Sequence, residues 1–381
     1  MSENNLNIQM VDLKGQYEKI KTQVDQAIND VLSSTQFING EHVKSFQNEL
    51  AAYLGVKHVI TCANGTDALQ ISMMALDLKP GDEIITPSFT YIATTEVIGL
   101  LGLKPVFVDC DPKNFNISVD EVEKAITKKT KAIVPVHLFG QSSDMKSIMS
   151  LAKKYNLFVI EDNAQAIGSD YLGFDQLQKT GTIGNIGCTS FFPSKNLGCF
   201  GDGGAMMTND DELAKKLRMI ANHGQSKRYY HDIVGCNSRL DNIQAAVLRI
   251  KLKELDQYIL NRQKAANYYD QNLKNFDQLT IPFRNLYSNH VFHQYTLKLD
   301  DSIVRDELIQ YLAGKNIPAM VYYPVPGHKQ KMFSKIPNSH GNMEITNWLT
   351  SRVFSLPMHT ELSNLQQDYI IENISSFLNK K

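Results

Sequence analysis

The chain has 381 residues, 43% hydrophobic and 21% charged, with a formal net charge of -1, as expected of a globular protein with about two domains. This charge gives no electrostatic reason to bind nucleic acid or an acidic membrane, and five cysteines without C-x-x-C spacing argue against a zinc site or a disulfide framework. The N-terminus lacks a basic start before an apolar core, and no apolar run could span a bilayer, so we expect a cytoplasmic protein without membrane contacts.

Short apolar strands alternate with helical patterns over the first two thirds of the chain. Continuous apolar strands separated by helices predict a mainly parallel sheet covered on both faces, so the fold class is α/β. Ligands of such sheets bind at the carboxyl ends of the strands. The expected strands cover residues 58–63, 82–89, 104–109, 131–139, 157–162, 188–192 and 204–209.

A long helical pattern over roughly residues 240–275 is expected to bridge to a second domain. We predict a large domain with an N-terminal helical segment over residues 1–260 and a small C-terminal α/β domain over residues 261–381. In the small domain we expect strands at residues 291–299 and 319–325 and helices near residues 303–314 and 362–379.

Three common motifs are absent: the dinucleotide fingerprint, the phosphate-binding P-loop and the G-x-S-x-G nucleophile elbow. What remains lies near the strand ends. The first feature is "CANGTDAL", where Asn64 and Gly65 turn the chain after a strand and Thr66 and Asp67 open a helix. A helix N-terminus presents free N–H groups to a phosphate, although an ordinary N-cap without a ligand would look the same.

The second feature is "VIEDNAQAIGS", in which Glu161 and Asp162 end an apolar strand and Gln165 follows three residues later. The acids can serve a ligand or simply reach solvent. In the stretch "SFTYIATTE", Phe89 and Tyr91 end another strand, and their rings belong either to the core or against a planar ligand.

The third feature is "SFFPSKNLGCFGDGGA", which places Lys195 between aromatic residues and a run of glycines. An amine among apolar rings loses solvation, so its pKa falls and its neutral form can make a Schiff base. The alternative is an ordinary surface lysine. A Schiff-base lysine, a carboxylate, a phosphate cup and an aromatic ring together are what pyridoxal 5'-phosphate (PLP) needs.

On these motifs the chain resembles the sugar aminotransferases of the DegT/DnrJ/EryC1/StrS family, which have the fold of type I PLP enzymes. The resemblance covers nearly the whole chain and includes "NGTDAL", "PSFTYIAT", "VPVHLFGQ", "EDNAQAIG", "SFFPSKNLG", "GDGGA" and "GCNSRLDNIQAA". It implies PLP as cofactor, with pyridoxamine 5'-phosphate as its amine form. It also implies a homodimer whose active sites are built from both subunits.

The resemblance assigns the cofactor contacts residue by residue. Lys195 matches the lysine that binds PLP and moves protons, and Asp162 matches the acid on the pyridine nitrogen. Gln165 matches the position near the phenolic oxygen, and Tyr91 matches the stacking ring. The phosphate ligands are matched by Gly65, Thr66 and Ser190, and by Asn237 from the other subunit.

Two further positions, Arg239 and His328, match residues that line the sugar-nucleotide pocket. The resemblance implies transfer of an amino group from L-glutamate to a nucleotide-linked keto sugar. We favour a UDP-linked 3-keto-N-acetylglucosaminuronic acid for lipopolysaccharide-type glycans, because Arg239 and His328 can hold a carboxylate. Alternatives are a dTDP-linked 3-keto-6-deoxyhexose, a 4-keto sugar, a PLP-dependent sugar dehydratase and a non-catalytic binding protein.

Overall fold

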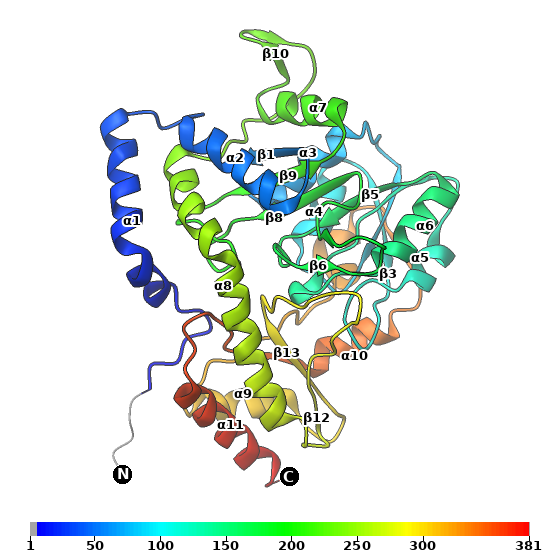
Figure 1. Cartoon of the computed structure of the whole chain (residues 1–381). Helices are drawn as coiled ribbons and strands as arrows, with labels where there is room; N and C mark the ends of the chain where they lie inside the picture. Colours follow the sequence, from blue (N-terminus) through cyan, green and yellow to red (C-terminus); the bar gives the residue numbers. More distant parts are fainter. Residues whose placement is uncertain (1–5, 381) are drawn as a thin grey trace.

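The structure is a computed structural model that describes residues 6–380. Its central sheet contains β1 (His58–Cys62), β2 (Glu83–Pro87), β3 (Lys104–Val108), β4 (Thr130–Ile133), β5 (Phe158–Asp162), β8 (Ile186–Ser190), β9 (Gly204–Thr208) and β14 (Ser339–His340). The strand order is β1-β9-β8-β5-β4-β2-β3-β14 (Figure 1). Within this sheet β9 is antiparallel to both neighbours, and the other neighbouring pairs are parallel. The predicted α/β fold with a mainly parallel sheet is therefore confirmed.

Helices cover both faces of this sheet. They are α2 (Glu41–Leu54), α3 (Gly65–Ala75), α4 (Ala93–Leu100), α5 (Val119–Ala125), α6 (Met145–Tyr155), α7 (Asp211–Ala221) and α8 (Asn242–Leu273). Adjacent strand residues are buried on opposite sides: Ile84 packs with α3, α4 and α7, while Ile85 packs with α5 and α6. Val59 likewise faces α2 and α8, and Ile60 faces α3. Burial on both faces explains why these strands are continuous apolar runs.

The long helix α8 spans two hydrophobic cores (Figure 1). Its buried residues up to Ile259 join the core of the large sheet, and those from Ala265 onward join a second core. The helix α1 (Leu13–Ser34) packs along the first half of α8. The predicted domain boundary at residue 260 falls inside this continuous helix, and the division into two domains stays a prediction.

The second core lies around a three-stranded antiparallel sheet. Its elements are β12 (Leu279–Thr280), β13 (Tyr295–Leu299), β15 (Val353–Leu356), α9 (Arg305–Ala313) and α11 (Asn364–Leu378), with α10 (Glu344–Arg352) beside them. The strand expected at residues 319–325 does not form, and Met320 makes only an isolated bridge to Ser355. Pro324 and Pro326 explain this, because proline has no N–H for a ladder. The strand β14, which was not expected, joins the large sheet beside β3.

Short elements complete the chain. They are the hairpins β6 (Asp170–Tyr171) with β7 (Gln178–Lys179) and β10 (Gln225–Lys227) with β11 (Tyr230–His231), and the 3-10 turns η1 (Leu138–Gly140), η2 (Gly327–Lys329) and η3 (Lys331–Ser334). The β10–β11 hairpin projects from the body of the molecule next to α7 (Figure 1). Its tip is exposed, with Tyr229 at 78% of its full accessibility.

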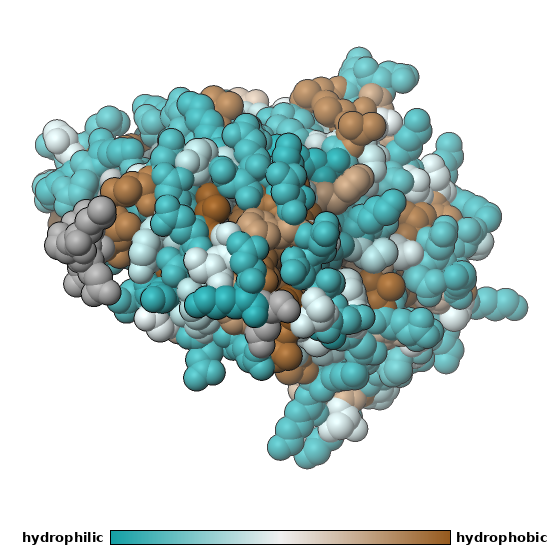
Figure 2. All heavy atoms as spheres, turned by 90° about the horizontal axis from the view of Figure 1, so that it is seen from below, coloured by the Kyte–Doolittle hydropathy of each residue, from teal (hydrophilic) through white to brown (hydrophobic). Residues whose placement is uncertain are grey.

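Most of the surface seen in Figure 2 is hydrophilic, with apolar residues in separate groups among polar ones. Across residues 6–380, none of the helices has the length and apolar character needed to cross a membrane.

Candidate active site

Asp162 is the last residue of β5, at the centre of the sheet, and its side chain is almost fully buried. Its Oδ2 accepts a hydrogen bond from Thr94 Oγ1 at 2.7 Å, and its Oδ1 accepts one from the Ala164 N–H at 3.1 Å. Thr94 lies in the first turn of α4, so two separate elements hold this carboxylate in one orientation. Thr94 is not among the predicted site residues, although it lies in the stretch "SFTYIATTE".

The neighbouring acid, Glu161, has a structural position instead, because consecutive strand residues point to opposite faces. Its carboxylate accepts hydrogen bonds from the N–H groups of Gly181 at 2.8 Å, Ile183 at 2.7 Å and Gly184 at 2.6 Å. Its Oε2 also lies 2.9 Å from Nε2 of the fully buried His137. Of the two strand-end acids, Asp162 alone is therefore left for a ligand.

Gln165 connects the loop after β5 to two aromatic residues, Phe139 and Tyr323. Its Oε1 accepts a hydrogen bond from the Phe139 N–H at 2.7 Å, and its Nε2 donates one to the hydroxyl of Tyr323 at 2.9 Å. Burial raises the pKa of Tyr323, so this hydroxyl stays protonated. The ring centre of Tyr323 lies 6.1 Å from that of Tyr91, which is 57% exposed and therefore accessible to a ligand. Tyr323 was also missed, although the pair of tyrosines in "AMVYYPV" is a signal for it.

Lys195 lies in the loop after β8, where its N–H donates to the Phe192 carbonyl at 2.8 Å. Burial lowers the pKa of its amine to about 8, and the negative charge of Asp162 opposes this shift. The direction is the one expected from the apolar setting. Among the described residues no hydrogen bond to its Nζ is present. Near physiological pH the amine therefore exists partly in the neutral, nucleophilic form.

A cradle for an anion lies where α3 begins. The side chain of Asn64 caps the helix by accepting a hydrogen bond from the Asp67 N–H at 2.8 Å. The N–H groups of Gly65 and Thr66 lie in the first turn of α3. No helical carbonyl precedes them by four residues, so they have no partner inside the helix. A Cβ on Gly65 would lie 2.7 Å from the Cβ of Ser190, so only glycine lets the helix end meet that strand end. This geometry suits a phosphate.

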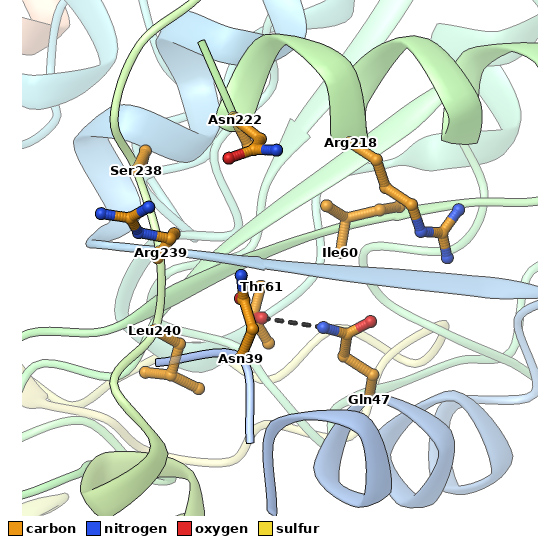
Figure 3. A pocket seen from close by; sticks show the side chains of 10 residues that line it. Asn39, Gln47, Ile60, Thr61, Arg218, Asn222, Ser238, Arg239 and Leu240 are labelled. Carbon is orange, nitrogen blue, oxygen red and sulfur yellow. Dashed lines mark hydrogen bonds between the residues drawn. The ribbon is translucent and has the colours of Figure 1, made fainter. Parts of the chain in front are cut away.

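Asn237 and Arg239 lie on the segment before α8, where Asn237 forms an isolated bridge with Asn222. Asn237 is exposed, and Arg239 lines a cavity of about 200 Å³ at the edge strand β1 (Figure 3). Figure 3 shows the guanidinium groups of Arg239 and Arg218 on opposite sides of this cavity. Ser238 lies between Asn237 and Arg239 in the sequence. Its hydroxyl donates to Asp67 Oδ2 at 2.6 Å, which attaches the segment of residues 237–239 to the start of α3. This segment therefore lies beside the cradle, with Ser238 buried against α3 and Asn237 exposed.

His328 has protein partners of its own. Its Nδ1 lies 2.7 Å from Ser88 Oγ, which also accepts from its N–H at 3.1 Å. Burial lowers the pKa of His328 to about 4, with smaller contributions from His340 and Lys329. The side chain is thus neutral at physiological pH. The expected charge-assisted contact between a carboxylate and a cationic His328 does not follow from this geometry.

The residues near the strand ends fit PLP. Four groups lie at the carboxyl ends of neighbouring elements: the Lys195 amine, the oriented Asp162 carboxylate, the anion cradle at Gly65 and the half-exposed ring of Tyr91. Each corresponds to one part of the cofactor: its aldehyde carbon, ring nitrogen, phosphate and ring face. The residue roles remain proposals.

The profile of the DegT/DnrJ/EryC1/StrS aminotransferase family matches residues 18–375. This chain belongs to that family. The prediction of a PLP-dependent sugar aminotransferase is therefore confirmed, and the cofactor is PLP.

The proteins similar to this chain have names that describe different activities. The "UDP-2-acetamido-2-deoxy-3-oxo-D-glucuronate aminotransferase" of Pseudomonas aeruginosa is 45% identical over 93% of this chain and 96% of its own length. A "Pleiotropic regulatory protein" of Geobacillus stearothermophilus is 45% identical over 98% of this chain and 99% of its own. The "UDP-N-acetyl-3-dehydro-alpha-D-glucosamine 3-aminotranferase" of Acidithiobacillus ferrooxidans is 44% identical over 95% of each. A Bacillus subtilis structure titled "with bound cofactor pmp" superposes with a TM-score of 0.88 at 30% identity, covering 97% of this chain and 83% of that one.

Proposed function

We propose that this aminotransferase moves an amino group from L-glutamate to a UDP-linked 3-keto-N-acetylglucosaminuronic acid for lipopolysaccharide or O-antigen synthesis. The observation that carries the transfer reaction is the juxtaposition of a partly neutral Lys195 amine with the oriented carboxylate of Asp162. The choice of sugar is supported by the Pseudomonas aeruginosa relative, whose name gives a 3-oxo-glucuronate. The Acidithiobacillus ferrooxidans relative supports the alternative of a 3-keto sugar without the C6 carboxylate.

In this proposal each part of the site holds one part of the cofactor. Lys195 would bind it through Nζ, Asp162 would face its ring nitrogen, and Tyr91 would cover its ring. The cradle of Gly65, Thr66 and Ser190 would receive its phosphate, and Gln165 would lie near the phenolic oxygen. When bound, PLP supplies an electron-withdrawing ring that stabilises negative charge on the carbon losing a proton.

The chain's own residues handle the protons. The negative charge of Asp162 would hold a proton on the ring nitrogen, and its contacts with Thr94 and Ala164 prevent the carboxylate from turning away. The amine of Lys195, with its pKa near 8, can take a proton from one carbon and return it to another. The hydroxyl of Tyr323 keeps Gln165 in place from the other side.

We also propose a homodimer in which Asn237 reaches the phosphate of the partner subunit's cofactor. Asn237 is exposed, and it leads from the projecting β10–β11 hairpin toward α8. Arg239 lies two residues later on the same extended segment, so it would face the same partner site. The sugar nucleotide would then bind between the subunits.

Reduction with borohydride should fix the cofactor to Lys195 in the purified holoenzyme. A bond to Nζ in this position follows from the lowered pKa and the lack of a hydrogen-bond partner. The measurement is peptide mass spectrometry after reduction, with Lys251 as an internal control, because its pKa is also lowered to about 8 but it lies on α8. Cofactor attached to Lys251, or to no lysine, would refute the assignment.

Arg239→Ala should slow turnover of the uronic acid substrate relative to its 6-deoxy analogue by roughly tenfold or more. A charge-assisted hydrogen bond to the C6 carboxylate is worth about 1.5–3 kcal/mol, and the analogue lacks that group. Comparison of kcat/KM for the two substrates measures the ratio. His328→Ala is the matched control and should change the ratio less, because His328 is neutral and held by Ser88. Equal losses on both substrates from Arg239→Ala would indicate that Arg239 binds phosphate instead.

A further inference from the structure

The turn η1 presents a fixed backbone donor beside Asp162. The N–H of His137 donates to the carbonyl of Asp162 at 3.0 Å, so this turn begins directly next to the end of β5. Phe139 follows with a φ of 58°, in the left-handed region that residues other than glycine rarely adopt. This conformation directs its N–H to Oε1 of Gln165 at 2.7 Å. The ring of Phe139 is buried and its carbonyl accepts from the Gln294 N–H at 3.3 Å, so the donor has little freedom to turn away.

This fixed donor decides which way the amide of Gln165 points. A backbone N–H can only donate, so the amide atom that faces Phe139 is the carbonyl oxygen. The amide nitrogen therefore faces Tyr323 and donates to its hydroxyl oxygen at 2.9 Å. Because the oxygen of Tyr323 accepts this hydrogen, the hydroxyl must direct its own hydrogen elsewhere.

The hydroxyl hydrogen of Tyr323 has no acceptor among residues 6–380. Burial raises the pKa of this hydroxyl, so the hydrogen is retained at physiological pH. The ring that carries it is held in place, with its centre 6.4 Å from that of Phe89 and 6.1 Å from that of Tyr91. Tyr323 thus offers an unpaired O–H donor next to Gln165, on the side of the site that Tyr91 borders.

We propose that Tyr323 donates this hydrogen to the phenolic oxygen of the bound cofactor. The inference rests on the placement proposed above, in which Asp162 faces the ring nitrogen and Gln165 lies near the phenolic oxygen. On the pyridine ring, only the carbon that bears the methyl group separates the nitrogen from the carbon that bears this oxygen. Two residues three positions apart in one loop can therefore serve both groups, and Tyr323 lies directly beside the second.

The chemistry of the acceptor suits this donor. The phenolic oxygen of the cofactor carries negative charge, and hydrogen bonds to a charged acceptor are stronger than those between neutral groups. The hydroxyl of Tyr323 also ends a chain that runs from the Phe139 N–H through the amide of Gln165. Each bond in such a chain polarises the next, which makes the last hydrogen a better donor.

The test compares two ligands of the cofactor-free full chain by isothermal titration calorimetry: pyridoxamine 5'-phosphate and its 3-deoxy analogue, which lacks the phenolic oxygen. Both compounds carry an amine in place of the aldehyde, so neither forms a bond to Lys195. Tyr323→Phe should weaken binding of pyridoxamine 5'-phosphate by about tenfold or more, as expected for a lost hydrogen bond to a charged oxygen. The same variant should bind the 3-deoxy analogue as tightly as wild type does, because the analogue has no oxygen to receive the hydrogen.

A second background separates direct donation from an effect that Tyr323 exerts only by holding Gln165. In Gln165→Met protein, Tyr323→Phe should still weaken binding of pyridoxamine 5'-phosphate several-fold, since a direct donor acts without the amide. No further loss in this background, or an equal loss for both ligands with native Gln165, would overturn the proposal. Tyr323→Met gives the same comparison if Tyr323→Phe does not fold.

Tyr322→Phe is the matched control. The hydroxyl of this half-buried neighbour makes no hydrogen bond among the described residues, so the variant should leave both dissociation constants unchanged. Ligand binding by the wild type distinguishes this role from the proposed function. Wild type that binds neither compound would overturn the cofactor site and the role of Tyr323 together. Wild type that prefers pyridoxamine 5'-phosphate, with the same preference in Tyr323→Phe, would overturn the role of Tyr323 alone.

Discussion

Asp162→Asn should retain bound cofactor but lower turnover by at least ~100-fold, as removal of an electrostatic group at a reacting centre commonly does. The substitution preserves the size of the side chain, and Oδ1 can still accept from the Ala164 N–H. The hydroxyl of Thr94 can rotate to accept from the new amide. What is lost is the negative charge that would keep the ring nitrogen protonated. Cofactor absorbance gives the occupancy, and kcat with glutamate and a keto sugar nucleotide gives the turnover.

Thr94→Val is the matched control for this experiment. It removes one hydrogen bond to Asp162 Oδ2 but leaves the charge, so its turnover should fall much less than that of Asp162→Asn. If Asp162→Asn binds cofactor and turns over at nearly the normal rate, Asp162 does not have the proposed role.

Co-expression of Lys195→Ala with Asn237→Asp should restore activity that neither variant has alone. Lys195→Ala removes the amine, and Asn237→Asp would place a negative charge against the cofactor phosphate in a partly dry site. In a hybrid dimer one site receives both substitutions. The other combines native Lys195 from one chain with native Asn237 from its partner. Activity should return toward half of wild type per hybrid dimer, measured on hybrids purified with two different affinity tags.

The control pairs Lys195→Ala with Asp162→Asn. In the structure these two residues belong to one site within one chain, since the charge of Asp162 acts on the Lys195 amine. Hybrids of this pair have a defect in each site and should stay nearly inactive. If hybrids carrying Asn237→Asp also stay inactive although both chains fold and associate, the shared-site dimer is wrong.

The strand ends that carry the site could be predicted from the sequence, because buried parallel strands are continuous apolar runs and ligands bind beyond their carboxyl ends. Which of the two acids at the end of β5 faces the ligand did not follow from the local pattern, and only the family resemblance selected Asp162. That choice depends on the alternation of side chains and on the loop at residues 181–184, which binds Glu161. Thr94 and Tyr323 were missed because they lie 68 and 158 residues from their partners Asp162 and Gln165.

The fold departs from the sequence-based expectation where a proline ends a strand or where a strand forms only by pairing with a distant part of the chain. The strand expected at residues 131–139 ends as β4 at Ile133, and Pro135 beyond it has no N–H to continue the ladder. The two-residue strand β14 has no apolar run of its own and depends on the edge of β3. By contrast, the long pattern at residues 240–275 predicted α8 closely, because helical periodicity over many turns is a strong local signal.

The unbroken course of α8 has a mechanical consequence. With 32 residues, the helix is about 48 Å long and carries one core on each half. The cores therefore have no loop hinge where α8 joins them, and helices bend only gently without a proline or an inserted side chain. Arg262 sits between Ile259 and Ala265, where the helix passes from one core to the other, and it binds the backbone at His293. Any tilt of α8 relative to the large sheet would therefore move Arg262 together with the backbone of Phe292 and His293.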